Sequence, residues 1–563
     1  MKLDLNERSD DRPEWLKDIT LNVDELWQYP VREPLEQTIA KELSQCCAAN
    51  FSAANIFCSN GGDESIYILM RLIKETARVI LPLPAFSQYT QGLESWALDG
   101  RTIAANEDLS INLDAVIDAI SEQPGSVVIL TSPNNPTGEL VTLNALKQVL
   151  DAAAANQSWV FFDEAYIEFS EQKSAIELIE EYDNLVVLRT LSKAFGLAGI
   201  RFGYLAANAR LIELFKQRAM PFNIPAPSLQ IAKEAMSQRA QQDVKRFVTR
   251  IQQNRAELFQ WFKQRNLQPF PSHSNFLLIP MPLLQADLLT QVLKRKGIAV
   301  RRFNDDELKS CVRITIPFYL TPLIDALEDV FDPQLLCFDM DGVLIDTSSS
   351  YDEAIAATVK KFSGKAVERA TILAKRRQGG FNNDWVLSQS LIAEAQGNAV
   401  ALEPVIDYFQ SVYLGSETNP GCIANETAIL NQDAAQAINT LNVRTAIVTG
   451  RPRYEAKLGS ELLQKTLKVW QPSAIVSTDD VTDCKPSPEG ILGLKQAFNA
   501  NRSWMFGDTP DDMQAARRSN SIAIGIGQQN QQQLRAAGAD LVIDNINQII
   551  DLLTATESNE RLG

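Results

Sequence analysis

The chain has 563 residues and a formal net charge of -17, and these two figures exclude several kinds of protein. A chain this long exceeds what one hydrophobic core usually organises, so we expect at least two domains. Its composition, 45% hydrophobic and 22% charged residues, is that of a globular protein, and no apolar run approaches the roughly 18 residues of a membrane helix. An acidic chain repels phosphate backbones, which argues against nucleic acid and favours small molecules as ligands.

The cysteine and histidine content narrows the chemistry further. Seven cysteines are scattered without a Cys-x-x-Cys pair, which disfavours disulfides and thiolate zinc sites. No apolar signal segment follows Met1, so we expect a cytoplasmic protein with reduced thiols. His273 is the one histidine, and its turn-like surroundings favour a structural role. Acid and base chemistry must therefore come from Lys, Asp, Glu or Tyr.

The first motif in chain order is a glycine pair between two predicted elements. A helical pattern at residues 35–43 is followed by β-like residues 56–58, which lead through Gly61 into a second helical pattern. Glycine lets the backbone approach an anion, and free N–H groups at the start of a helix bind one. The layout predicts an anion site at the backbone of Gly62, Asp63 and Glu64, although a Gly-Gly turn alone is weak evidence.

Three apolar runs with the character of buried strands come next. In α/β proteins, the carboxyl ends of parallel strands carry the ligand-binding residues. A carboxylate at such an end can pair with the ring nitrogen of a cofactor and keep that nitrogen protonated. The three runs are residues 79–82, 127–130 and 159–162, of which the second leads to Asn135 and the third to Asp163.

A fourth strand, predicted at residues 185–188, is followed by a lysine placed to react. Thr190, Ser192 and Lys193 come directly after the strand, and Arg201 lies eight residues beyond the lysine. A lysine amine can bind an aldehyde cofactor covalently, while two hydroxyls and an arginine can hold that cofactor's phosphate. Pyridoxal phosphate fits this description. For this segment alone, a surface lysine beside a helix start is the alternative interpretation.

Together these motifs resemble those of fold-type-I aminotransferases, and most of all the histidinol-phosphate aminotransferases. The resemblance implies pyridoxal 5'-phosphate as cofactor, with Lys193 as the catalytic amine. It implies that Phe86 stacks on the cofactor ring, that Asp163 pairs with the ring nitrogen, and that Asn135 and Tyr166 bind the phenolic oxygen. The cofactor phosphate would be held by Gly62, Asp63, Glu64, Thr190, Ser192 and Arg201.

The same resemblance implies a homodimer, because the family's tyrosine before proline reaches the cofactor phosphate of the other subunit. Tyr29 matches that tyrosine, and a tyrosine packed under a loop is the alternative. Near the N-terminus, Arg8 stands where the family has a loop that lines the substrate site. We therefore expect Arg8 to change the charge of the pocket entrance.

Residues 210–265 have a helical pattern, and strands at 275–279 and 312–316 predict a smaller α+β lobe. In the family, an arginine of the last strand binds the anionic group of the substrate. Arg313 matches it. Arg301 is a second candidate, with a solvated charge as the alternative.

A new pattern begins after residue 332. The strand predicted at 335–338 runs into Asp339 and Asp341, and a carboxylate at a strand end can attack phosphorus while a second one protonates the leaving oxygen. Three further motifs follow in order. They are Thr449 in Thr-Gly-Arg-Pro, Lys485 in Asp-Cys-Lys-Pro, and Asp508 and Asp512 in Gly-Asp-Thr-Pro-Asp-Asp.

These four motifs resemble the haloacid dehalogenase superfamily. The resemblance implies Asp339 as nucleophile, Asp341 as acid/base, Thr449 as a ligand of a phosphoryl oxygen, and Lys485 as a counter-charge. Hard oxygen ligands imply Mg2+, held by Asp339, Asp341, Asp508 and Asp512. A helical stretch at about 351–425 resembles a cap that excludes water and selects the substrate. Its segment 376–381 either touches substrate or is a solvated charge run.

We therefore predict an α/β chain with two domains. Residues 1–332 form an aminotransferase with a large parallel sheet and a small α+β lobe, and residues 333–563 form a Rossmann-like hydrolase with a helical cap. The fusion favours a bifunctional enzyme of histidine biosynthesis, because histidinol-phosphate aminotransferases make a phosphate monoester that is next dephosphorylated. One alternative is an aromatic amino acid aminotransferase, or an enzyme like threonine-phosphate decarboxylase, fused to a phosphatase of unrelated substrate resembling phosphoglycolate phosphatase. A cofactor-binding regulatory protein without catalysis is an alternative of another class.

Overall fold

The structure is a computed structural model, and it describes residues 1–553 except 48, 49, 77, 377, 379, 380, 382, 417 and 442. The chain packs as two compact units. Of the described residues, the first contains Met1–Met281 and Gly297–Leu323, and the second contains Pro282–Lys296 and residues 324–553. Among the described helices, none is long and apolar enough to cross a membrane.

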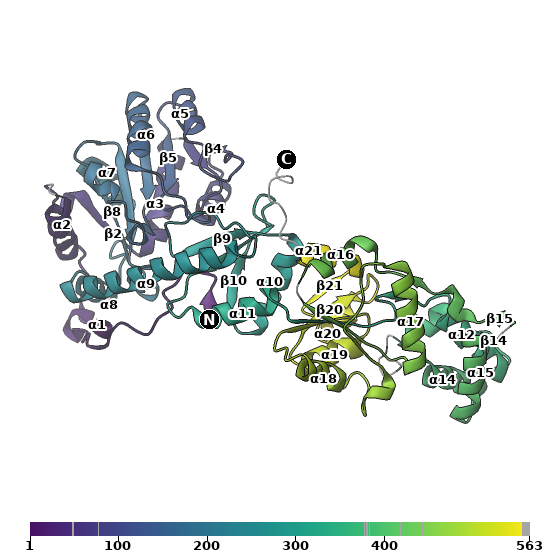
Figure 1. Cartoon of the computed structure of the whole chain (residues 1–563). Coiled ribbons are helices and arrows are strands. Elements are labelled where there is room, and N and C mark those ends of the chain that lie inside the picture. Colours follow the sequence, from purple (N-terminus) through teal and green to yellow (C-terminus); the bar gives the residue numbers. More distant parts are fainter. Residues whose placement is uncertain are drawn as a thin grey trace. The chain divides into compact units, whose positions relative to one another are not determined.

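The first unit is built on a seven-stranded sheet (Figure 1). All neighbouring strands are parallel except β8, which runs antiparallel to both of its neighbours. The central strands are buried along their whole length, as expected for a parallel sheet covered on both faces. In spatial order the strands are β2 (Ile56–Ser59), β8 (Gly203–Ala207), β7 (Leu185–Thr190), β6 (Trp159–Asp163), β5 (Val127–Thr131), β3 (Val79–Pro82) and β4 (Gly100–Ile103).

Helices pack around this sheet. Residues of α3, α4 and α7 share one hydrophobic core with alternate strand residues such as Val127 and Ile129, while α5 and α6 pack on each other and on β3 and β6. The helices of this unit are α1 (Glu14–Lys17), α2 (Glu33–Cys47), α3 (Gly61–Thr76), α4 (Ser87–Ser95), α5 (Leu113–Glu122), α6 (Leu143–Ala155), α7 (Ala209–Lys216), α8 (Ala226–Ala235) and α9 (Gln238–Lys263).

A second sheet of the first unit corresponds to the predicted smaller lobe. Its order is β1 (Lys2–Leu3), β10 (Ala299–Arg302), β11 (Cys311–Thr315) and β9 (Phe276–Pro280). Strands β9, β11 and β10 are antiparallel neighbours, and the N-terminal β1 adds to β10 in parallel. The start of the chain is therefore fixed on this sheet.

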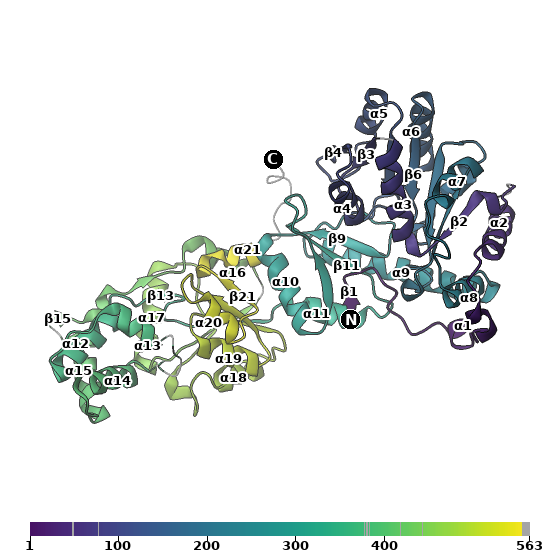
Figure 2. The same cartoon turned by 180° about the vertical axis from the view of Figure 1, so that it is seen from behind.

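The second unit contains a six-stranded parallel sheet, seen from both sides in Figures 1 and 2. Its strands are, in spatial order, β18 (Ala474–Val476), β17 (Arg444–Val448), β12 (Leu335–Phe338), β19 (Ser503–Gly507), β20 (Ile522–Ile526) and β21 (Leu541–Ile543). The helices of this part are α10 (Leu283–Arg295), α11 (Thr321–Phe331), α16 (Gln432–Thr440), α17 (Arg453–Thr466), α18 (Glu489–Ala497), α19 (Pro510–Arg518), α20 (Gln531–Ala536) and α21 (Ile549–Leu553).

The helical stretch predicted after residue 351 forms four helices with a hydrophobic core of their own. They are α12 (Tyr351–Ser363), α13 (Arg369–Arg376), α14 (Asp384–Gln396) and α15 (Leu402–Leu414), followed by β14 (Gly415–Ser416) and β15 (Asn419–Pro420). The chain leaves the parallel-sheet core through β13 (Ile345–Asp346) and returns through β16 (Thr427–Ala428), and these two short strands pair with each other. We call the helical part the cap and the paired strands its base.

The predicted α/β class is confirmed, with one parallel and one mostly parallel sheet. In the seven-stranded sheet, two strands were not predicted from the sequence. Strand β4 lies at the sheet edge and is mostly exposed, and β8 is made of glycine, alanine and only two larger apolar or aromatic residues. Neither has the apolar run from which the other strands of this sheet were predicted.

Candidate active sites

A cavity of about 1440 Å³ opens in the first unit at the carboxyl ends of its central strands. Parallel strands end at the same edge of a sheet, so motifs far apart in the sequence meet there. Of the residues proposed from the motifs, the cavity is lined by Gly62, Asp63, Phe86, Asn135, Asp163, Tyr166, Thr190, Ser192, Lys193, Arg201, Arg301 and Arg313.

Lys193 lines the cavity next to the N-terminal segment. Its Nζ donates to the carbonyl of Leu5 at 3.0 Å and lies 5.7 Å from the centre of the Tyr166 ring. The Tyr166 hydroxyl accepts a hydrogen bond from Asn6 Nδ2 at 3.0 Å. The N-terminal segment is thus part of the wall around the lysine.

Asp163, at the end of β6, is a buried carboxylate with defined partners. Burial raises its pKa to about 6, while hydrogen bonds from Tyr89 and from the backbone of Ala165 act in the opposite direction. The Tyr89 hydroxyl lies 2.7 Å from Asp163 Oδ2, and Tyr89 is completely buried. Tyr89 was not singled out in the sequence, although it follows Phe86 by three residues at the start of α4.

Part of the cavity wall fits a phosphate group. Helix α3 begins at Gly61, and the N–H groups of a first helical turn have no partner within the helix. A Cβ on Gly61 would lie 2.5 Å from Arg201 Nη2, so glycine is required for the arginine to lie there. Arg201 also pairs with Asp63 at 2.5 Å, and Thr190 Oγ1 donates to Ser192 Oγ at 2.9 Å.

Two arginines line the substrate side. Arg313 is buried and donates to Asn135 Oδ1 and to the carbonyl of Asp4, and burial lowers its pKa from the usual value. Arg301 lies directly opposite Arg313 in the β10–β11 pair. Two neighbouring guanidinium groups favour an anionic substrate.

Three residues considered in the sequence do not point into the cavity. The Glu64 side chain accepts from the backbone N–H of Asn60 at 2.6 Å and from Asn223 at 2.7 Å, so only its own backbone N–H can serve an anion. Tyr29 is 76% exposed and stacks on Phe222 with ring centres 4.4 Å apart. The expectation that Arg8 changes the charge of the pocket entrance is wrong, because Arg8 does not line the cavity.

Arg8 is a buried structural arginine. Its side chain is 4% exposed and pairs with Asp10 at 2.6 Å and Asp243 at 2.8 Å. The guanidinium also lies 4.2 Å from the ring centre of Phe247. Since two carboxylates offset its charge and it does not line the cavity, it does not change the charge of the pocket entrance.

The second site lies at the carboxyl ends of β12, β17 and β19 in the second unit. Lys485 Nζ lies 2.7 Å from Asp339 Oδ1 and 2.6 Å from Asp512 Oδ1. Burial raises the pKa of Asp339 to about 7, with Lys485 acting against that rise and Asp512 adding to it. The pKa of Asp508 is raised well above its usual value by burial and by the neighbouring Asp339 and Asp512.

The donor set at this site fits a divalent cation. Within the part of the chain that the structure describes, Asp339, Asp508 and Asp512 form a group whose carboxylate oxygens lie within 4.8 Å of one another. Oxygen ligands and clustered negative charge suit Mg2+. Gly342, at φ +72°, permits this packing, because a Cβ there would lie 2.3 Å from Asp508 Oδ2. Asp341, also predicted as a ligand, does not belong to the group.

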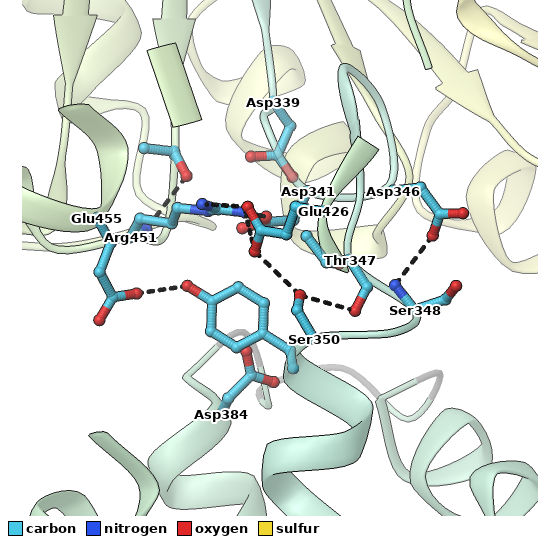
Figure 3. Close-up of polar contacts among 12 residues, drawn as sticks. Asp339, Asp341, Asp346, Thr347, Ser348, Ser350, Asp384, Glu426, Arg451 and Glu455 are labelled. Carbon is cyan, nitrogen blue, oxygen red and sulfur yellow. Dashed lines mark hydrogen bonds and ion pairs between the residues drawn. The ribbon is translucent and has the colours of Figure 1, made fainter. Parts of the chain in front are cut away.

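The carboxylate of Asp341 pairs instead with Arg451, as Figure 3 shows. The backbone N–H of Arg451 donates to Thr449 Oγ1 at 3.1 Å. Two of the predicted phosphatase residues, Asp341 and Thr449, therefore contact this arginine. Sequence reasoning assigned it no role, although it stands in the Thr-Gly-Arg motif itself.

Arg376 of the cap is not a solvated charge. It pairs with Asp352 at 2.9 Å and Asp384 at 2.5 Å. Of the segment 376–381, residues Arg377, Gly379 and Gly380 lie outside the described part of the chain.

Comparison with known proteins gives separate matches for the two halves. Residues 11–326 match the family described as aminotransferase class I and II, and residues 333–520 match the haloacid dehalogenase-like hydrolases. A histidinol-phosphate aminotransferase of Chlorobium phaeovibrioides is 34% identical over 340 residues, which cover 58% of this chain and 90% of that protein. One from Caldanaerobacter subterraneus is 30% identical over 326 residues, covering 56% and 88%.

A solved structure agrees in fold with the first half. The histidinol-phosphate aminotransferase from Clostridium acetobutylicum aligns with a TM-score of 0.53 at 22% identity, covering 59% of this chain and 99% of that one. The remainder of this chain has no counterpart in that structure.

Proposed function

The chain belongs to the class I and II aminotransferase family and also carries a haloacid dehalogenase-like hydrolase domain, and on this premise we propose that it is bifunctional. The first activity transfers an amino group between histidinol phosphate and imidazole-acetol phosphate, with glutamate and 2-oxoglutarate as the second pair. The observation that carries it is the meeting of Lys193, Asp163 and Asn135 in one cavity. Relatives named histidinol-phosphate aminotransferases support the choice of substrate.

Each residue of the first site has a defined task. Pyridoxal phosphate, when bound, supplies the aldehyde that carries the amino group and a ring that withdraws electrons from the substrate carbon. Lys193 Nζ holds that cofactor and moves the proton at the substrate carbon. Asp163 keeps the ring nitrogen protonated, and the start of α3 with Arg201 binds the cofactor phosphate. Arg313 and Arg301 bind the anionic group of the substrate.

The second activity is hydrolysis of a phosphate monoester. Asp339 attacks phosphorus, Asp341 protonates the departing oxygen, and Thr449 and Lys485 hold the phosphoryl oxygens. Asp339, Asp508 and Asp512 would bind Mg2+, whose charge offsets that of the carboxylates and the phosphate. Histidinol phosphate is the proposed substrate, because the first site would produce it and its phosphate is the group that the second site removes.

The proposed enzyme is a cytoplasmic homodimer with the boundary between its two functions at residues 332 and 333. Tyr29 supports a dimer, because it does not line the cavity of its own chain and its ring is exposed and stacks on Phe222, which is exposed as well. Its neighbours in the sequence include further exposed apolar residues, Leu26, Trp27 and Val31. A second copy placed on this segment would cover these side chains and bring Tyr29 to the partner's cofactor phosphate.

Spectroscopy distinguishes the proposed enzyme from a cofactor-binding regulator. The purified protein with pyridoxal phosphate is titrated with glutamate, histidinol phosphate and aromatic amino acids while the visible absorbance of the bound cofactor is recorded. The proposal predicts a shift with glutamate and with histidinol phosphate. A shift with aromatic amino acids alone would mean that these, and not histidinol phosphate, are the amino donors. No shift with any amino donor would mean that the protein is a cofactor-binding regulator.

A further inference from the structure

Arg451 is a buried arginine to which the proposed phosphatase chemistry assigns no task. Its side chain is 1% exposed, and the turn that contains it also contains Thr449, the proposed phosphoryl ligand. A buried guanidinium is costly unless carboxylates pair with it. Arg451 has two such partners, and one of them is the proposed acid/base (Figure 3).

The contact with Asp341 fixes only one of its carboxylate oxygens. Arg451 Nη2 and Nε donate to Asp341 Oδ1 at 2.6 and 2.9 Å. No described residue bonds Asp341 Oδ2, and the Asp341 side chain remains 31% exposed. A carboxyl group that transfers protons must be held in one orientation and must keep one oxygen available. The contact between Arg451 and Asp341 meets both requirements.

The second partner, Glu426, joins this arginine to the base of the cap. Its side chain is 1% exposed, and both of its carboxylate oxygens lie 3.1 Å from Arg451. Glu426 also accepts hydrogen bonds from Ser350 at 2.9 Å and from Tyr413 at 2.8 Å. Ser350 directly precedes α12, Tyr413 belongs to α15, and Glu426 directly precedes β16.

A second set of contacts supports the same junction. The ring of Tyr351 lies 5.2 Å from the Arg451 guanidinium, and its hydroxyl donates to Glu455 of α17. Gln410 of α15 donates to the other oxygen of Glu455 at 2.6 Å. Asp341 is therefore connected through Arg451 and Glu426 to the residues where the cap meets the parallel-sheet core.

We propose that Arg451, held by Glu426, is the positioning residue that directs Asp341 for proton transfer, an inference that rests on the proposed phosphatase function. In the first step, an oxygen of Asp339 bonds to phosphorus, the bond from phosphorus to the leaving oxygen breaks, and that oxygen takes the proton of Asp341. In the second step, water gives a proton to Asp341 as it attacks the phosphorus of the aspartyl phosphate, which releases Asp339 and inorganic phosphate. Arg451 keeps Asp341 Oδ2 directed at the reacting oxygen in both steps.

Two matched substrates test this role. In 4-nitrophenyl phosphate the leaving group departs without a proton, whereas in phenyl phosphate it benefits from an acid. The comparison uses kcat/KM, which reports only the steps up to departure of the leaving group. Arg451→Gln should lower kcat/KM for phenyl phosphate by about 100-fold and for 4-nitrophenyl phosphate by less than about 10-fold, because general acid catalysis contributes about 10² to 10⁴. Equal losses on both substrates would overturn the inference.

A double-mutant cycle provides an independent measurement. Asp341→Asn already lacks the acid, so adding Arg451→Gln to it should change kcat/KM for phenyl phosphate by less than about threefold. Losses that multiply would show that Arg451 acts apart from Asp341, and would contradict the proposal.

Two further variants keep the test valid if Arg451→Gln does not fold, since that change leaves Glu426 buried without its partner. Arg451→Gln combined with Glu426→Gln removes both charges, and Arg451→Lys keeps the positive charge without the planar fork. Each should show the same selective loss on phenyl phosphate, the lysine variant to a smaller degree, and an unselective loss in them would overturn the inference. Asp339→Asn separates the two claims: if it still releases phosphate, the proposed phosphatase function fails, whereas its inactivity beside an unselective Arg451→Gln rejects only the role of Arg451.

Discussion

Each of the two sites lies at the carboxyl edge of its own sheet, but the charged side chains that dominate the two sites have opposite signs. In the first unit, Lys193, Arg201, Arg301 and Arg313 surround a cavity whose proposed cofactor and substrates are anionic. In the second, Asp339, Asp508 and Asp512 cluster together, and Lys485 pairs with Asp339 and Asp512. We propose that the first site attracts phosphate and carboxylate groups by itself, while the second needs a cation before it can accept a phosphate.

The largest effect is expected at Lys193. Lys193→Ala removes the amine that we propose holds the cofactor and moves the proton, so transamination should fall by at least about 10⁴-fold. Phosphate release from 4-nitrophenyl phosphate by the same variant serves as control and should stay at the wild-type rate. Transamination that survives the change would mean that another amine does the chemistry.

Removal of divalent cations should affect only the second site. Dialysis against EDTA should lower phosphate release by about 10³-fold, because a metal contributes several kcal/mol to stabilising charge at phosphorus. Adding Mg2+ should restore it, and transamination measured in parallel should not change. Full phosphatase activity in EDTA would contradict the proposed metal role of Asp339, Asp508 and Asp512.

Asp163 should make the stability of the cofactor-free protein depend on pH. Burial raises the pKa of Asp163 to about 6 from 3.8, so its protonated form stabilises the fold fully below about pH 4. That contribution disappears as the pH rises through about 6, and it amounts to at most about 3 kcal/mol. Thermal unfolding of the cofactor-free wild type should therefore show a decline from pH 4 to pH 7 that is smaller in Asp163→Asn. The same decline in both proteins would assign it to other groups, such as Glu164.

The smallest effect is expected at Tyr29. Tyr29→Phe should weaken binding of pyridoxal phosphate by about 1.5 to 3 kcal/mol, the value of one hydrogen bond to a charged group. Equilibrium dialysis measures the change, and sedimentation should show a dimer in both proteins. Unchanged cofactor affinity would return Tyr29 to a packing role on Phe222.

The sequence predicted that the residues at the strand ends lie together, because the carboxyl ends of parallel strands lie at one edge of a sheet. Asn135, Asp163 and Lys193 follow separate strands and meet in one cavity, and the motif resemblances to both families are confirmed by the matches to residues 11–326 and 333–520. The direction of individual side chains was not predictable. Asp341 and Arg451 are 110 residues apart, and no local pattern shows that one points at the other.

Arg8 and Tyr29 illustrate two other limits of the sequence. The charge of Arg8 is offset partly by Asp243, which lies on the distant helix α9, so position in a motif was a poor guide to its surroundings. Tyr29 has its proposed task only in a second copy of the chain. In both cases the deciding partner is far away in sequence or in another molecule.

The central claim, two chemistries joined in one chain, is tested most directly by a single reaction. Wild-type protein with pyridoxal phosphate and Mg2+ is given imidazole-acetol phosphate and glutamate, and histidinol phosphate, histidinol and inorganic phosphate are measured over time. We predict that wild type forms histidinol and phosphate in equal amounts, and that Asp339→Asn stops at histidinol phosphate, because an amide is a poor nucleophile toward phosphorus. Wild type that accumulates histidinol phosphate without releasing phosphate would contradict the claim.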